Sequence, residues 1–134
     1  MPELPEVETL KKSLSPVVGK CFQKIEVLSG HCLYHMTPVF FQERARGRCI
    51  QRISRRGKYL RIHLDDESTL TVHLRMTGRL RLGTLEEVPQ RHVHVKFWLN
   101  DGRLLWFQDT RKFGRIYLDD EPPGLALLGP EPLS

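Results

Sequence analysis

The amino terminus is the part of the sequence whose residue types most directly suggest chemistry. The chain begins Met1-Pro2-Glu3-Leu4-Pro5-Glu6. A small residue at position 2 permits removal of Met1, which leaves Pro2 with a free secondary amine of pKa near ~8. Such an amine can attack a sugar C1′ or a carbonyl carbon and form an iminium, and the Glu3 carboxyl group can protonate the opened sugar and shuttle protons. If Met1 is retained, the Pro2 nitrogen is an amide and cannot form an iminium.

The same residues also fit an ordinary helix start. Proline and glutamate are favoured in the first helical turn for backbone and dipole reasons. Val7, Leu10 and Leu14 then share one face of a helix over residues 5–14. From the residues alone, both interpretations of the amino terminus stay open.

Basic side chains are concentrated in the middle of the chain. The formal net charge is +5, but residues 44–115 carry seventeen basic and seven acidic side chains, and residues 116–134 carry four acidic and no basic ones. Residues 44–61 contain seven arginines, one lysine and no acid. Guanidinium groups bind phosphate in bidentate geometry, and a basic stripe releases counterions from a polyanion. Nucleic acid is the expected partner, although a solvated face with salt bridges has the same composition.

The elements that must position these residues follow from the hydrophobic pattern. Alternation with period two predicts strands, and we expect them over residues 22–28, 60–64, 70–74, 93–99, 104–107 and 115–118. Asn100-Asp101-Gly102 predicts a hairpin turn, and residues 37–47 predict a short capped helix. Because alternating strands bury one face, we expect a mainly β (α+β) fold, a two-layer antiparallel β-sandwich flanked by the N-terminal helix and the second short helix.

Length and composition exclude several classes of protein. The 134 residues fit one domain, no apolar run is long enough for a membrane span, and the amino terminus does not resemble a signal peptide. Three cysteines without a Cys-x-x-Cys pair favour a reducing compartment and a cytoplasmic location. Cys49 is expected to be a small buried apolar residue. His31, Cys32 and His35 lack further ligands nearby, so no metal site is expected.

The domain organisation is expected to change near residue 120. Residues 1–120 contain the predicted strands and helices and are expected to form one β-sandwich domain. Residues 121–134 are rich in proline and glycine, which is typical of a linker toward a further domain.

Several separated motifs give the chain a resemblance to a known family. Besides the opening Met1–Thr9, they are Arg55–Leu60, His73–Gly78, His92–Val95, Asp109–Gly114 and Leu128–Leu133. With these motifs in this order the sequence resembles formamidopyrimidine-DNA glycosylase, the bacterial enzyme family that excises oxidised purines such as 8-oxoguanine. The resemblance runs along the whole chain and corresponds to the family's N-terminal catalytic domain.

The resemblance implies a set of catalytic residues. Pro2 would be the nucleophile and Schiff-base residue, and Glu3 the general acid and base. Lys58 would help to protonate or stabilise the sugar and the strand that is cut, and Glu6 would support the lesion pocket and the amino terminus. The implied activity is that of a bifunctional DNA glycosylase and abasic-site lyase that cuts the strand by β,δ-elimination.

The resemblance also implies a set of DNA-contacting residues. They are His92, Arg111, Met76, Phe113, His73 and Arg56. Met76, Arg111 and Phe113 would fill the gap left by the extruded nucleotide, since apolar wedges offset part of the cost of unstacking. From the residues alone, Met76 and Phe113 fit core packing as well. The expected partner is damaged double-stranded DNA, bound by a monomer.

The family has a second domain with a helix–two-turns–helix and a zinc finger. This sequence has no Cys-x-x-Cys pair, so no cofactor is expected in this chain and structural zinc is expected only in that C-terminal domain. One alternative is a catalytically silent DNA-binding fragment. Another is an endonuclease-eight-like glycosylase for oxidised pyrimidines, a branch that usually begins Pro-Glu-Gly-Pro-Glu, so Leu4 favours the purine enzyme.

Overall fold

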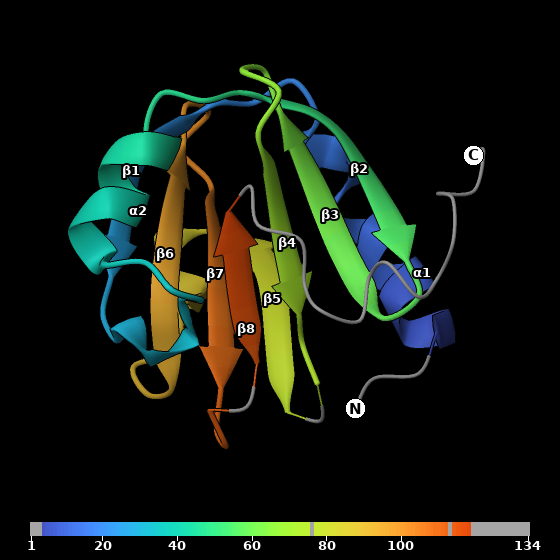
Figure 1. Ribbon diagram of the computed structural model, residues 1–134, viewed down its shortest axis with the longest axis vertical. Coiled ribbons are helices and arrows are strands. Elements are labelled where there is room, and N and C mark those ends of the chain that lie inside the picture. The colour runs from blue at the N-terminus through green and yellow to red at the C-terminus, as the bar shows by residue number, and fades with distance from the viewer. Residues whose placement is uncertain (1–3, 76, 113, 119–134) are drawn as a thin grey trace.

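Two four-stranded antiparallel sheets pack face to face in the computed structural model (Figure 1). The structure describes residues 4–75, 77–112 and 114–118, and within residues 4–8 it describes the backbone alone. The first sheet has the order β1-β6-β7-β5, with β1 at Phe22–Val27, β6 at Val93–Leu99, β7 at Leu104–Asp109 and β5 at Gly78–Gly83. The second has the order β2-β3-β4-β8, with β2 at Ile50–Arg56, β3 at Tyr59–Leu64, β4 at Thr69–His73 and β8 at Arg115–Leu118. The expected antiparallel β-sandwich is confirmed.

Two α-helices flank the sandwich. Helix α1 spans Leu4–Ser13 and lies against β2 and β3, and α2 spans Pro38–Ala45 and lies against β1. Thr37 caps α2 through its hydroxyl oxygen, which accepts a hydrogen bond from the Phe40 N–H at 3.1 Å. Short 3₁₀ turns are η1 at Ser15–Val17, η2 at Gly30–Cys32 and η3 at Leu85–Glu87. No helix in the described part of the chain has the length and apolar character needed to cross a bilayer.

The core lies between the sheets because alternate residues of each strand point inward. In β3 the buried residues are Leu60, Ile62 and Leu64, and their neighbours in sequence are partly exposed. Phe97 of β6 lies among other aromatic rings, with ring centroids 5.1 Å from Phe22 and 6.0 Å from Phe41. Helix α2 therefore closes one side of the core through Phe41.

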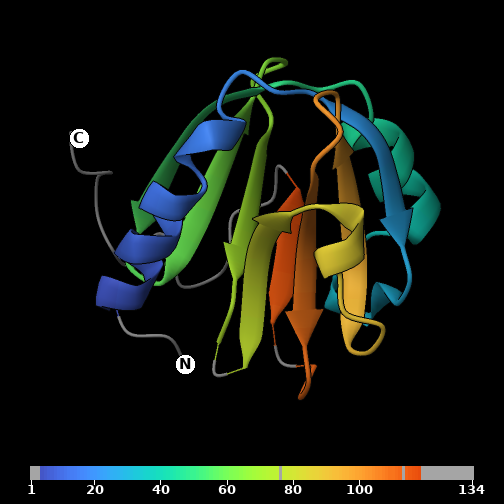
Figure 2. The same cartoon turned by 180° about the vertical axis from the view of Figure 1, so that it is seen from behind.

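Three connections in the described part of the chain pass from one sheet to the other. One runs from β1 through α2 to β2, and the other two are short. The turn after β4 leads from the second sheet to β5 in the first, and the loop after β7 leads from the first sheet to β8 in the second. Both short connections lie at the same end of the sandwich, as Figure 2 shows from behind. Residues from both sheets therefore meet at this end.

Strands β2 and β5 were not among the predicted elements. In β2 the pairing with β3 shifts between Ile50 and Arg52, so the apolar positions lose their regular alternation. In β5 Leu80 is buried between exposed Arg79 and Arg81, a strand pattern that is flanked by the turn-forming Gly78 and Gly83.

The expectation of reduced cysteines is wrong. Cys21 and Cys49 lie opposite each other in an antiparallel bridge and form a disulfide. Cys49 is half-buried rather than buried, and Cys32 is the buried cysteine. The bridge links the starts of β1 and β2, which lie far apart in sequence, so the pairing could not be inferred from cysteine spacing.

Candidate nucleic-acid interface

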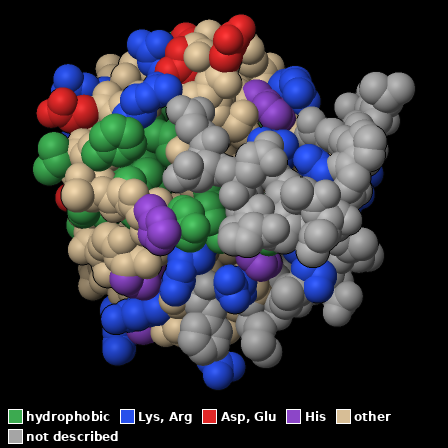
Figure 3. All heavy atoms as spheres, viewed as in Figure 1, with side chains coloured by type: hydrophobic (Ala, Val, Ile, Leu, Met, Phe, Trp, Pro, Cys, Tyr) green, Lys and Arg blue, Asp and Glu red, His purple; other side chains and the backbone are tan. Residues whose placement is uncertain are grey.

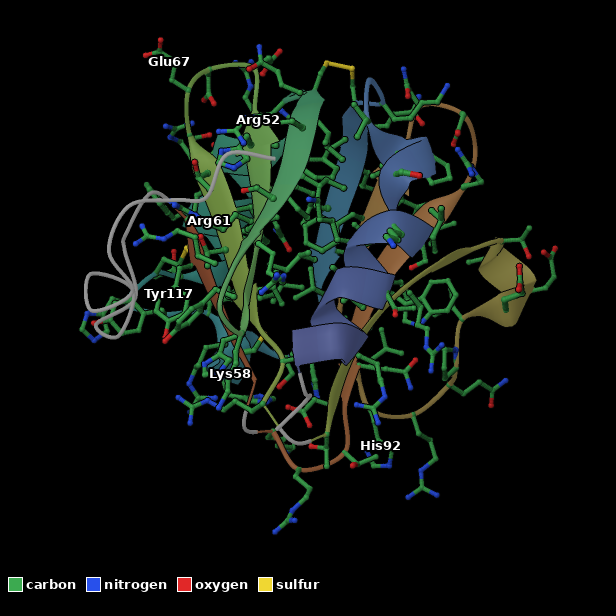
Figure 4. All side chains as sticks on the ribbon, turned by 90° about the vertical axis from the view of Figure 1, so that its right-hand side faces the viewer. Arg52, Lys58, Arg61, Glu67, His92 and Tyr117 are labelled. Carbon is green, nitrogen blue, oxygen red and sulfur yellow. A yellow bond between two sulfur atoms is a disulfide. The ribbon has the colours of Figure 1, made fainter. Side chains whose placement is uncertain are left out.

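Four segments meet at one end of the sandwich, which we name the loop end. They are the β2–β3 turn (57–58), the described residues of the β4–β5 turn (74–75 and 77), residues 91–92 before β6, and the described residues of the β7–β8 loop (110–112 and 114) with its flanking residues Asp109 and Arg115. Figure 4 shows Lys58 and His92 toward this end and Glu67 at the opposite end. The first turn of α1 also lies at the loop end (Figure 2).

A row of polar and aromatic residues crosses the second sheet at the loop end. Strand register places Arg56 opposite Tyr59, Tyr59 opposite His73, and His73 opposite Arg115. Residues that lie directly opposite one another share a face of the sheet. Arg56 is half-buried, and Lys58 is exposed on the turn that joins β2 to β3. The row thus brings together three of the residues predicted to bind DNA or to take part in catalysis.

His73 is the most perturbed titratable group of this row. The side chain is 8% exposed, and neither ring nitrogen has a hydrogen-bond partner within the described part of the chain. Burial, followed by the positive charges of Arg75 and Lys58, lowers the pKa of His73 to about 4. His73 is therefore neutral at pH 7 and offers a ligand one N–H donor and one acceptor nitrogen.

The β4–β5 turn and the β7–β8 loop present cations to solvent. Arg75 on the first, and Arg111 and Lys112 on the second, are exposed. Arg75 and Lys112 have positive φ angles of 58° and 62°, as has His92 at 67°. Such backbone conformations are sparsely populated by non-glycine residues and cluster at functional loops.

The loop end carries a strong positive charge. Among the described residues of the four segments that define the loop end, Asp109 is the single acidic one, and its side chain is 1% exposed. Figure 3 shows Lys and Arg side chains gathered toward the end of the molecule where β7 finishes and β8 begins. A surface of this kind attracts a polyanion and focuses its approach.

Asp109 is a residue that the sequence motif contained but to which no role was assigned. Its carboxylate accepts hydrogen bonds from the backbone N–H of Arg111 at 3.1 Å and of Gly114 at 2.7 Å. Burial raises the pKa of this carboxyl group, but hydrogen bonds from Thr77 and from the backbone of the loop outweigh burial and lower the pKa overall. An aspartate followed five residues later by a glycine is the sequence feature that could have indicated a loop folded around the carboxylate.

The structure brings together five of the ten predicted site residues. Lys58, His73, His92, Arg56 and Arg111 all lie at the loop end. His92 adjoins the β7–β8 loop, since its carbonyl oxygen accepts the Asp109 N–H at 2.9 Å. The remaining predicted residues, Pro2, Glu3, Met76, Phe113 and the side chain of Glu6, lie outside the described residues.

Comparison with known sequences gives one consistent family. Residues 1–116 match the family model described as the formamidopyrimidine-DNA glycosylase N-terminal domain. The chain is 46% identical over 140 residues to the formamidopyrimidine-DNA glycosylase of Symbiobacterium thermophilum, a match that covers 100% of this chain and 46% of the relative. Identity to the enzyme of Heliobacterium modesticaldum is 44% over 142 residues, which covers 99% of this chain and 51% of the relative.

Comparison with solved structures agrees. A crystal structure of the Lactococcus lactis enzyme in complex with DNA containing an abasic site is similar with a TM-score of 0.81 and 36% identity, over 87% of this chain and 43% of that one. The complex of the same enzyme with DNA containing FAPY-dG has a TM-score of 0.80 and 37% identity over the same shares. The chain spans about half the length of the curated relatives that it matches.

Proposed function

Because the chain belongs to the formamidopyrimidine-DNA glycosylase family and corresponds to its N-terminal domain, we propose that it is the catalytic domain of a base-excision repair enzyme that acts on damaged double-stranded DNA. The observation that carries this proposal is the meeting of three things at the loop end. The first is the start of α1, which directly follows Pro2 and Glu3 in the sequence. The second is the exposed Lys58, and the third is the pair of cationic connections, the β4–β5 turn and the β7–β8 loop.

The proposed reaction is removal of an oxidised purine followed by strand cleavage. The Pro2 amine, once Met1 is removed, forms a bond to C1′ while the bond from C1′ to the base breaks. Glu3 protonates the ring oxygen, the sugar opens, and an iminium forms between Pro2 and C1′. Loss of a proton from C2′ then expels the 3′ phosphate, and a second elimination expels the 5′ phosphate.

The described residues support this reaction through DNA binding and charge. Lys58 is exposed on the β2–β3 turn, and its proposed place is near the sugar and the phosphates of the cut strand. Neutral His73, with both ring nitrogens unpartnered within the described residues, suits a hydrogen bond to a phosphate oxygen or to a base edge. Arg111 suits the base opposite the lesion because guanidinium groups pair with base edges in bidentate geometry. Met76 and Phe113 are proposed to fill the space of the extruded nucleotide.

The remaining parts of the proposal concern the partners and surroundings of the domain. The domain acts as a monomer and needs no cofactor of its own. A cytoplasmic location stays part of the proposal because the DNA is there, although the Cys21–Cys49 disulfide removes the argument from reduced cysteines. A C-terminal domain following the linker at residues 121–134 holds a structural zinc ion and adds to the grip on DNA.

The test is borohydride trapping on abasic-site DNA at low salt, with protein whose mass shows that Met1 has been removed. Wild type and Pro16→Gly, a control in the exposed η1 turn, should give a covalent adduct. Protein that retains Met1 should give none and should keep its affinity for the duplex, because its Pro2 nitrogen is an amide and cannot form an iminium. Pro2→Gly should give less adduct than the wild type, because a primary amine replaces the secondary amine of proline.

Salt-sensitive binding without an adduct in the wild type would mean that the chain is a silent DNA-binding fragment. The lesion is tested separately, with one duplex containing 8-oxoguanine and one containing an oxidised pyrimidine. Faster release of the pyrimidine would favour the endonuclease-eight branch over the purine enzyme.

A further inference from the structure

Asp109 is buried at the point where the two short connections between the sheets meet. It is the last residue of β7, and its partner in the neighbouring strand is Gly78, the first residue of β5. An ionised carboxylate that is buried without partners is strongly destabilising. Its contacts therefore identify the structural elements that depend on it.

One set of contacts holds the β7–β8 loop. One carboxylate oxygen accepts the Arg111 N–H and the other accepts the Gly114 N–H. Lys112 also donates a backbone hydrogen bond to the carboxylate, and its positive φ of 62° turns the chain so that successive N–H groups converge. The loop is folded around a negative charge supplied by its own first residue.

A second contact holds the β4–β5 turn. The Thr77 hydroxyl donates a hydrogen bond to the same carboxylate oxygen that accepts the Arg111 N–H. The two donors belong to different connections, so one oxygen atom joins them. The turn itself is closely packed, because a Cβ at Gly78 would lie 2.4 Å from the Leu74 carbonyl oxygen.

The backbone of Asp109 ties this arrangement to β6. Its N–H donates to the His92 carbonyl oxygen at 2.9 Å, and its carbonyl oxygen lies 2.8 Å from Nε2 of His94. Movement of Asp109 would therefore shift three segments of the loop end together. Each of these segments carries an exposed side chain that can face DNA, namely Arg75, His92 and Arg111.

We propose that Asp109 is a positioning residue that holds the β4–β5 turn and the β7–β8 loop at one fixed separation, so that both connections engage damaged DNA as a unit. The role of this unit in DNA recognition rests on the proposed function. The coupling of the two connections is independent of the proposed function, because it is a property of the free protein.

The first test uses amide hydrogen exchange on the free chain. Asp109→Asn should raise the exchange rates of the Arg111, Lys112 and Gly114 amides about tenfold or more, because an amide side chain offers one acceptor oxygen where the carboxylate offers two. Thr77→Val, which removes only the hydroxyl, should raise exchange in residues 111–114 as well as in its own turn. Unchanged exchange in the β7–β8 loop of Thr77→Val would overturn the coupling.

The second test measures binding to a duplex with a tetrahydrofuran abasic analogue and to the undamaged duplex, with 2-aminopurine opposite the lesion as a reporter of unstacking. Thr77→Val should lower the preference for the lesion about threefold to tenfold and reduce the 2-aminopurine signal, while affinity for undamaged duplex changes little. Thr77→Ser should restore both. An equal loss of affinity for the damaged and the undamaged duplex would overturn the positioning role.

The control is Asp101→Asn, which alters another carboxylate in the turn between β6 and β7, at the far end of the same hairpin. Asp101→Asn should leave the preference for the lesion and the amide hydrogen exchange of the β7–β8 loop unchanged. A wild-type chain without lesion preference would contradict the proposed function, and the exchange experiment would still decide whether Asp109 couples the two connections.

Discussion

The ring of His73 lies 4.6 Å from the ring of Tyr59, centroid to centroid, in the neighbouring strand β3. This contact covers one side of a histidine whose two ring nitrogens have no hydrogen-bond partner in the described part of the chain. A buried imidazole between an aromatic ring and two cationic turns is held in its neutral form. The loop end therefore combines fixed positive charges with one neutral ring.

The lowered pKa of His73 should appear in the pH dependence of stability. The folded-state pKa of His73, about 4, lies below the ordinary histidine pKa of 6.5, so the unfolded chain binds the extra proton first as the pH falls. The free energy of unfolding of the wild type should therefore drop below pH 6.5, and by pH 4.5 this one group accounts for about 2 kcal/mol. Urea denaturation of wild type and His73→Gln across this range measures the difference.

The exposed His35 on the segment before α2 provides the control. His35→Gln should follow the wild-type pH dependence. If His73→Gln loses stability with falling pH as steeply as the wild type does, His73 is not buried in the neutral form.

Lys58 should contribute to DNA affinity through a phosphate contact. Each such contact adds about 0.9 to the slope of log affinity against log salt concentration, so Lys58→Gln should have a slope shallower by about one unit. Fluorescence anisotropy with one duplex at several salt concentrations measures this slope. Lys20→Gln, beside the disulfide at the other end of the sandwich, should keep the wild-type slope. Equal slopes for Lys58→Gln and wild type would remove Lys58 from the DNA contacts.

Gly114 should be intolerant of even one added carbon atom. A Cβ there would lie 2.5 Å from Cζ of Phe107 and 3.2 Å from the Asp109 carboxylate. Gly114→Ala should therefore lower the free energy of unfolding by about 1 to 3 kcal/mol through overpacking. Gly102 has open space around its Cβ position but a φ of 90°, so Gly102→Ala should cost only about 1 kcal/mol. Thermal or urea denaturation shows which variant loses more free energy of unfolding. A smaller loss for Gly114→Ala than for Gly102→Ala would contradict the close packing.

The cysteines should react in an order set by the disulfide and by burial. Cys32 is buried, and burial raises the pKa of its thiol to about 12. A thiol reagent should therefore find no reactive thiol in the native oxidised chain, one after denaturation, and three after denaturation with reduction. Reduction of the Cys21–Cys49 bridge, which closes a loop between residues 28 apart, should lower the free energy of unfolding by roughly 3 to 4 kcal/mol. Three reactive thiols after denaturation alone would contradict the disulfide.

Much of the fold could be predicted from the sequence because apolar residues recur at every second position along β3, β4 and β6, at Leu60–Leu64, Leu70–Leu74 and Val93–Leu99. Strand β2 could not, since a register shift near Ile50 breaks the period, and the arginines of β2 and β5 are as typical of a solvated loop as of a strand. The disulfide depends on Cys21 and Cys49 meeting across strands that are distant in sequence.

The motifs that carry the family resemblance singled out Lys58, His92 and Arg111, which the structure places at one end of the sandwich, and their roles stay predictions. Asp109 could not be given a role in this way, because its importance lies in donors that converge on it from two connections. Thr77, the donor from the other connection, is 32 positions away in sequence. The neutral state of His73 likewise follows from burial and from neighbouring charges that only the fold brings together.

The β4–β5 turn and the β7–β8 loop have a consequence for how the proposed lesion preference can evolve. Each connection starts on one sheet and ends on the other, and packed sheets lie about 10 Å apart. The span of both connections is therefore set by the thickness of the hydrophobic core, in which Phe107 contributes a fully buried ring directly beside Gly114. Under the proposed function, a change of one methylene group in that core should alter the separation of the two connections and so the DNA deformation that they can match. Two relatives with identical loops should then differ in substrate through apolar residues that never touch DNA.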